Sequence, residues 1–209
     1  MIKALLMLIR PVSTWNGITE NNRSVAMVLL IFLLPLLLLT SVLEGYGLVH
    51  FGKYQSVPMS VLKKYTVQEA VVFETGHTML LAAAVFIIAT AARAFSQTFH
   101  TRNNFQQAFN AVAYGFAPLL SLRLLDGLSS INGWVAWGIG LALTLAVLYH
   151  GLPCILRPDP PHAFGLYFNT CVTVIVATGL LRLVVVYLWE GRLKGLSELI
   201  SSAAAKLPS

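Results

Sequence analysis

The chain has 209 residues, of which 57% are apolar and only 11% are charged, and its mean hydropathy is +0.75. Soluble globular proteins carry about 25% charged residues, because charge covers the surface that faces water. The composition therefore excludes soluble, disordered, collagen-like and coiled-coil classes and favours a membrane protein. The net charge of +6, from 14 basic and 8 acidic residues, suits anionic lipid headgroups better than nucleic acid.

The first segment, residues 1–24, is predicted to lie along the membrane surface. Lys3 and Arg10 are seven residues apart and share one helical face, while isoleucine and leucine residues cover the rest. A secretory signal would need a longer apolar core and a small-residue cleavage site. With Pro11 and Trp15 following, we expect a short interfacial helix, and a frayed terminus is the alternative.

Five apolar runs follow, each long enough to cross the hydrocarbon core of a bilayer as a helix. They cover residues 25–43, 71–95, 108–125, 134–152 and 164–189. Only helices satisfy their own backbone hydrogen bonds in lipid, apart from closed barrels. The predicted fold class is therefore all-α, a polytopic membrane protein with a five-span transmembrane helical bundle over residues 25–189. Residues 190–209 are expected to form a short polar tail.

The orientation in the membrane is only weakly indicated by charge. Five spans place the two termini on opposite sides, and the basic residues divide almost evenly between those sides. The acidic residues do not, since only Glu20 and Asp159 belong to the amino-terminal side. This favours a cytoplasmic amino terminus, although acidic residues contribute little to topology.

Two segments in the third and fourth runs resemble the signatures of the Yip1 domain family. Residues 113–120 read Ala-Tyr-Gly-Phe-Ala-Pro-Leu-Leu, and residues 148–153 read Leu-Tyr-His-Gly-Leu-Pro. These are similar to the tyrosine-glycine and proline motifs of that family. Residues 10–15, Arg-Pro-Val-Ser-Thr-Trp, resemble the start of its bacterial members, and residues 105–108 resemble the approach to its third helix. The order and spacing agree from about residue 9 to residue 189.

The resemblance implies a five-span membrane domain with a cytoplasmic amino terminus, of a short bacterial type and hence in a cell inner membrane. Eukaryotic members act in vesicle traffic and contact small GTPases. This chain lacks their long polar extension and their aspartate-leucine and glycine-proline motif, so GTPase binding is not expected. The resemblance implies a non-enzymatic membrane organiser or adaptor, which binds lipid, a membrane protein partner or a second copy of itself.

Charged residues inside the spans are the candidates for a functional site, because an unpaired charge in lipid is costly. Arg182 lies seven residues before Trp189, about 10 Å below the interface at helical rise. Span directions place six polar residues at the same end: Glu44, Glu69, Glu74, His77, Arg123 and Asp126. We expect Arg182 to pair with Glu74 first, because both lie inside their spans.

The predicted polar cluster comprises Glu44, Glu74, His77, Arg123, Asp126 and Arg182. It has two interpretations, which the sequence leaves open. The cluster could bind a headgroup, an anion or a proton, as in a small transporter or lipid-handling protein. It could instead be a set of structural ion pairs that fixes helix packing.

No catalytic residues, cofactor or metal are expected. Glu74 and His77 have the spacing found in di-iron bundles, but such sites need that pair twice and further glutamates. No G-x-S-x-G or H-E-x-x-H motif is present. A haem-binding redox subunit, the third possibility, would need two facing histidines at membrane depth. Small residues at every fourth position, such as Ala136, Gly140 and Thr144, predict close helix packing instead.

Overall fold

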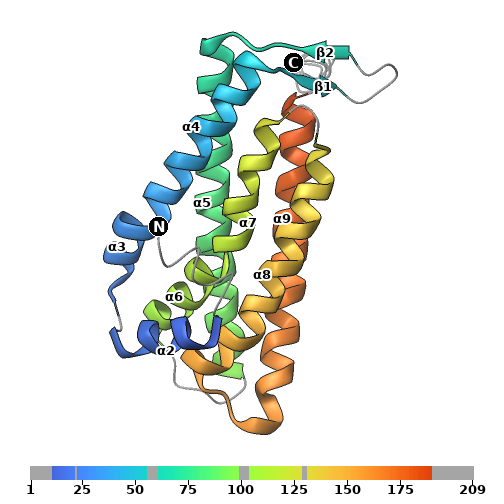
Figure 1. The fold of residues 1–209 in the computed structure, drawn as a ribbon. Coiled ribbons are helices and arrows are strands. Elements are labelled where there is room, and N and C mark those ends of the chain that lie inside the picture. Colours follow the sequence, from blue (N-terminus) through green and yellow to red (C-terminus); the bar gives the residue numbers. More distant parts are fainter. Residues whose placement is uncertain (1–10, 22, 56–60, 99–103, 129–130, 190–209) are drawn as a thin grey trace, which may run out of the picture.

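The computed structural model describes residues 11–21, 23–55, 61–98, 104–128 and 131–189. Within these residues, five helical segments are long and apolar enough to cross a membrane: Val25–His50, Val67–Thr98, Phe105–Gly127, Gly133–Leu156 and Pro160–Tyr187. They pack side by side in one elongated bundle (Figure 1). The predicted all-α five-span bundle is confirmed. The surface helix predicted within residues 1–10 and the tail over residues 190–209 lie outside the described residues.

The first span is interrupted near its start. It consists of α3 (Val25–Val28), a π-helical segment η1 (Leu29–Leu33) and α4 (Leu34–His50). Pro35 stands in the first turn of α4. Proline has no backbone N–H to donate to the preceding turn, and that turn is the wider π-helical segment η1, which ends where α4 begins.

A short antiparallel hairpin connects the first span to the second. Its strands are β1 (Lys53–Gln55) and β2 (Val61–Lys63), with Lys53 opposite Lys63. Gly52 begins the turn into β1 with φ at 71°, a conformation that glycine adopts at little cost. The hairpin lies over one end of the bundle, at the start of α5 (Val67–Thr98) (Figure 1). The sequence predicted only a polar connection here.

The third span is the central helix of the bundle. It is built from α6 (Phe105–Gly115), α7 (Ala117–Leu122) and a short 3-10 helix, η2 (Arg123–Gly127). Its most apolar stretch is 78% buried, against 33% to 50% in the other four spans. It packs against α4, α5 and α8 (Gly133–Leu156). The fifth span, η3 (Pro160–His162) and α9 (Ala163–Trp189), packs against α5 and α8.

Small residues let the central helix approach its neighbours, as their spacing predicted. A Cβ at Gly140 of α8 would lie 3.1 Å from the Cα of Leu119, and a Cβ at Gly115 would overlap the side chain of Leu148. Thr144, one turn after Gly140, is fully buried and accepts a hydrogen bond from the Leu119 N–H at 3.2 Å. That bond serves a backbone donor in the first turn of α7.

Residues 11–21 form α2 (Pro11–Asn21), which crosses the bundle toward the end opposite the hairpin (Figure 1). Trp15 and Ile18 are buried, with exposed fractions of 1% and 4%. The indole of Trp15 fills the space beside Gly151, where a Cβ would lie only 2.5 Å from Trp15 Cε2. Trp15 therefore attaches α2 to α8.

Candidate functional site

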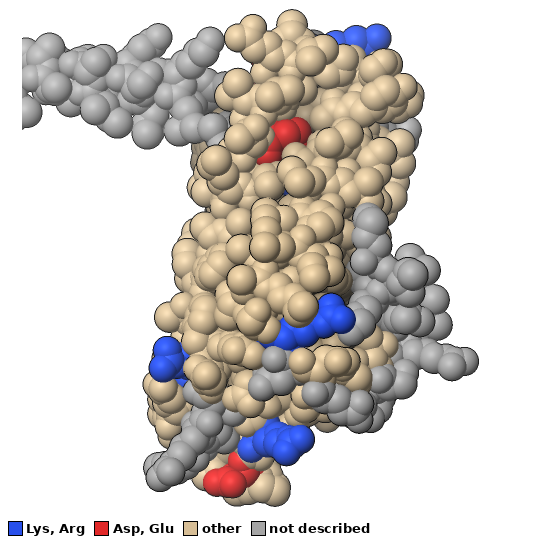
Figure 2. Space-filling view, turned by 90° about the vertical axis from the view of Figure 1, so that its left-hand side faces the viewer, with Lys and Arg blue, Asp and Glu red and all other residues tan. Residues whose placement is uncertain are grey.

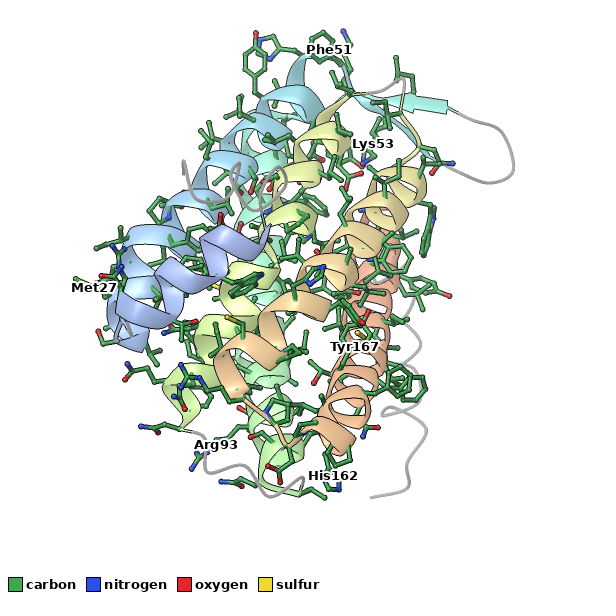
Figure 3. All side chains as sticks on the ribbon, turned by 60° about the horizontal axis from the view of Figure 1, so that its bottom comes forward. Met27, Phe51, Lys53, Arg93, His162 and Tyr167 are labelled. Atoms are coloured by element: carbon green, nitrogen blue, oxygen red, sulfur yellow. The ribbon has the colours of Figure 1, made fainter. Side chains whose placement is uncertain are left out.

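The polar residues of the predicted cluster come together at one end of the bundle, beneath the hairpin. All are buried, and a seventh charged residue, Lys53, joins them from β1. Figure 3 shows Lys53 and Phe51 at this end and Arg93 and His162 at the other. We call the seven residues the charge network: Glu44, Lys53, Glu74, His77, Arg123, Asp126 and Arg182.

Arg123 occupies the centre of one half of the network. Its Nε donates to Glu44 Oε2 at 2.6 Å, and its Nη2 donates to Glu74 Oε2. His77 Nδ1 lies 3.8 Å from the same Glu44 oxygen. One guanidinium thus joins the first span, the second span and the end of the third, in the fork geometry that suits carboxylates.

Asp126 occupies the centre of the other half. Arg182 donates to both of its oxygens, from Nη1 at 2.7 Å and from Nη2 at 3.3 Å. Lys53 Nζ lies 3.7 Å from Asp126 Oδ1 and donates to the Asp126 backbone carbonyl at 3.1 Å. The ring of Trp134, at the start of α8, lies 5.8 Å from the Arg182 guanidinium. Asp126 therefore joins the third span to the fifth span and to the hairpin.

The predicted pairing of Arg182 with Glu74 is wrong. Arg182 pairs with Asp126, whereas Glu74 pairs with Arg123. Both carboxylates lie at the correct end, and α5 packs on α9, but the third span brings its own charges between them: Arg123 takes Glu74, and Asp126 takes Arg182. Glu69, the other acidic residue weighed as a partner, accepts hydrogen bonds from the Thr66 N–H and hydroxyl at 2.9 Å. It caps the start of α5.

Lys53 was missed from the sequence because it belongs to the polar connection between spans. It is 8% exposed, and burial lowers its pKa to about 8, although Asp126 and Glu44 act in the opposite direction. A buried ammonium without a partner would be much less favourable. The available signal was its position three residues after His50, at the same end as the predicted cluster.

Two hydroxyl groups extend the network toward the surface of the bundle, and the sequence indicated neither. Ser41 Oγ donates to Glu74 Oε2 at 2.8 Å, and Thr78 Oγ1 donates to Ser41 Oγ at 3.1 Å. Ser41 stands three residues before Glu44 and Thr78 four after Glu74, so each shares a helix face with a network residue.

Some polar atoms of the network have no hydrogen-bond partner among the described residues: Glu44 Oε1, Glu74 Oε1, His77 Nδ1 and Arg123 Nη1. A cavity of about 40 Å³ lies beside His77 and Arg123, and Asp126 and Arg182 also line it. A buried water needs about 10–15 Å³ of such space and two to four polar partners. The cavity thus suits a few water molecules.

Glu44, Glu74 and His77 could in principle hold a metal ion, since one ligand atom from each lies within 4.8 Å of the others. Arg123, however, already binds an oxygen of each carboxylate. A divalent cation there would face the guanidinium at close range. The donor set therefore fits an internal ion pair better than a metal.

The outer side of the network faces a groove between α4 and α5. This groove has a volume of about 640 Å³ and an almost wholly apolar lining, in which Ser41, Glu74, Thr75 and Thr78 form the polar part of one wall. Figure 2 shows the α4 side of the molecule, where a red patch of acidic atoms is set in uncharged surface. The small cavity and the groove thus lie on different sides of the carboxylates.

The arrangement cross-links most of the bundle at one end, since its residues come from α4, β1, α5, η2 and α9. The Yip1 domain family matches residues 5–192, which is nearly the whole chain. No curated protein and no solved structure gives a significant match. The five candidate spans agree with a membrane family. The chain is an integral membrane protein and belongs to the Yip1 domain family.

Proposed function

We propose that this protein acts non-enzymatically as a membrane organiser or adaptor, which holds lipid or protein partners at the surface of its bundle. We place it in a cell inner membrane with a cytoplasmic amino terminus. The observation that supports this proposal is the internal pairing of the charge network. Three cations and three carboxylates neutralise one another, so their charge is used to join helices rather than to present a reactive group.

The alternative is a small transporter or lipid-handling protein that uses the network as its binding site. One observation favours it, because Glu74 lies both in the network and in the wall of the outer groove. Against a transport path stands the small size of the inner cavity, about 40 Å³. That space is far below the 300–1,000 Å³ of typical small-molecule sites.

A double variant distinguishes the two functions. Arg182→Leu leaves Asp126 with less compensation in a buried site and should lower stability by about 3–5 kcal/mol. Adding Asp126→Leu removes the uncompensated charge and should recover most of that loss. Thermal melting in mild detergent measures both effects. Arg93→Leu, at an exposed position toward the other end of α5, is the control and should stay close to the original stability.

The same variants are then compared in pull-downs with lipid and protein analysis. An organiser should keep its partners in the Arg182→Leu and Asp126→Leu double variant, because the fold is restored. A transporter or anion site should lose its ligand while the fold is restored, because the ligand needs the charges themselves. Loss of every partner from a stable double variant would therefore contradict the organiser function.

A further inference from the structure

The groove between α4 and α5 has a polar spot, formed by Ser41, Glu74, Thr75 and Thr78, that offers only hydrogen-bond acceptors. Each hydroxyl hydrogen there is already committed: Thr75 donates to the Val71 carbonyl at 2.7 Å, Thr78 to Ser41 at 3.1 Å, and Ser41 to Glu74 Oε2 at 2.8 Å. The second carboxylate oxygen, Glu74 Oε1, is buried and has no donor among the described residues, and Glu74 as a whole is only 5% exposed. A ligand for this spot must therefore bring N–H or O–H donors.

The charge at the spot favours a cation. Of the residues that the structure describes, Glu74 is the one charged residue that lines the groove, whereas Arg123, Asp126 and Arg182 line the small cavity on the other side of the network. Glu44, Glu74 and Arg123 together carry a formal charge of about −1 when His77 is neutral. The balancing positive charge of the network belongs to its other half, Lys53, Asp126 and Arg182, so this half attracts a donor that also carries a positive charge.

The depth of Glu74 matches the level of lipid headgroups. Helix α5 has 32 residues and is therefore about 48 Å long. Centred in a hydrocarbon core of about 30 Å, it extends about 9 Å beyond each side. Glu74 lies seven residues after Val67, hence about 10 Å from the helix start. This places its carboxylate at the boundary between headgroups and hydrocarbon. Tyr46 and His50, stacked at 3.9 Å, line the headgroup side of the groove.

The shape of the groove suits an acyl chain better than a helix. It runs along α4 from Leu34 to His50, about 24 Å at helical rise. Its volume of about 640 Å³ is several times smaller than the volume of about 1,900–2,700 Å³ that a helix of this length occupies. A helix with its side chains is about 10–12 Å wide. Below Glu74 the walls are apolar, with Leu34, Leu38, Met79 and Ala82.

We propose that this groove binds a bilayer phospholipid whose headgroup ends in a primary ammonium. The ammonium donates to the Glu74 carboxylate, and one acyl chain runs along Leu38 and Met79 toward Leu34 and Ala82. This lipid site deepens the proposed function, because it names the class of lipid that the bundle would hold. Specific binding of a primary ammonium can be distinguished from nonspecific lipid contact by comparison with a quaternary ammonium, which has the same charge but no N–H to donate.

The test compares two lipids with identical acyl chains. Purified protein in mild detergent is titrated with dioleoylphosphatidylethanolamine or with dioleoylphosphatidylcholine, and bound lipid is counted by native mass spectrometry. We expect the ethanolamine lipid to bind about tenfold more tightly or better, as one charge-assisted hydrogen bond allows. Glu74→Gln should reduce this ratio to about one.

A second variant keeps the test valid if Glu74→Gln fails to fold. Val42 lines the groove and is 68% exposed, so Val42→Trp should fill the groove without changing the charge network. It should abolish the bound ethanolamine lipid. Val176 of α9 is 53% exposed and lies outside the groove, so Val176→Trp is the matched control and should keep the lipid. Thermal melting of both variants checks the fold.

Three results would overturn the lipid site. The first is equal affinity of the original protein for both lipids, and the second is an ethanolamine preference that persists in Val42→Trp. The third is efficient cross-linking of Val42→Cys to a second chain under conditions that exclude lipid, which would make the groove a protein interface. The first two measurements do not report on capture of protein partners, and the third would itself show self-association, so failure of the lipid site leaves the organiser function to its own test.

Discussion

Gly133 packs directly against the charge network, and its replacement by alanine gives our first prediction. It is the first residue of α8 and faces the Arg182–Asp126 pair. A Cβ at this position would overlap Arg182 Nη2 and lie 2.5 Å from Asp126 Oδ1. The substitution Gly133→Ala therefore disturbs the ion pair while leaving every charge in place.

The size of the effect follows from two opposing contributions. Disrupting one buried ion pair costs about 3–5 kcal/mol, because both charges lose their compensation. Replacing glycine by alanine where the backbone allows it returns about 0.4–1 kcal/mol, through a smaller entropy of the unfolded chain. Gly133→Ala should therefore lower the free energy of unfolding by about 2–4 kcal/mol, since part of the strain is relieved by small shifts.

The matched control is Gly138→Ala, five residues further along the same helix. A Cβ at Gly138 meets no atom within 4 Å, so alanine there should leave stability unchanged or raise it by about 0.4–1 kcal/mol. Thermal or denaturant unfolding in mild detergent measures the difference between the two variants. Equal stability of Gly133→Ala and Gly138→Ala would refute the close packing of α8 on the ion pair.

Three further predictions address other contacts. Gly47→Ala should destabilise the protein in thermal melts more than Gly45→Ala, because a Cβ at Gly47 would overlap the backbone of Gly127 whereas one at Gly45 would lie 3.4 Å from Glu74 Cγ. Equal melts would contradict this. The pKa of Lys53 is about 8 in the folded protein and 10.5 ordinarily, so the unfolded chain binds more protons between these values. Stability should therefore rise by about 3 kcal/mol from pH 8 to pH 10.5, and Lys53→Met should remove this rise. Single cysteines at Gln55 and Ser209, with the native cysteines replaced, should react with an impermeant thiol reagent from the same side of the membrane; reaction from opposite sides would contradict five spans.

The sequence predicted the number of spans because hydropathy responds directly to the lipid environment. The third span was its shortest predicted run, residues 108–125, where the helix covers Phe105–Gly127. That helix has a mean hydropathy of 1.3 against 1.9 to 2.8 for the others. A helix that is surrounded by protein rather than lipid does not need to be strongly apolar, so the central element gives the weakest signal.

The members of the charge network were predictable, but their pairing was not. Alternating span directions fix which charges share an end of the bundle, and this placed Glu74, Asp126 and Arg182 together. Pairing depends on the rotation of each helix about its axis, which apolar runs do not determine because nearly every face is apolar. Lys53 was missed for a different reason, since its burial depends on a hairpin that folds back over the bundle.

The position of the third span also has a consequence for biosynthesis. Arginine and aspartate cost up to about 2.5–3.5 kcal/mol each when a helix enters the membrane alone, and this span carries Arg123 and Asp126. Glu44 and Glu74 are translated earlier and can receive Arg123 at once, but Arg182 is translated last. Before the fifth span has been synthesised, Lys53 alone compensates Asp126, and the closer partner Arg182 is missing. We expect ribosome-bound intermediates of this length to insert their third span incompletely, and insertion to be completed only when Arg182 arrives.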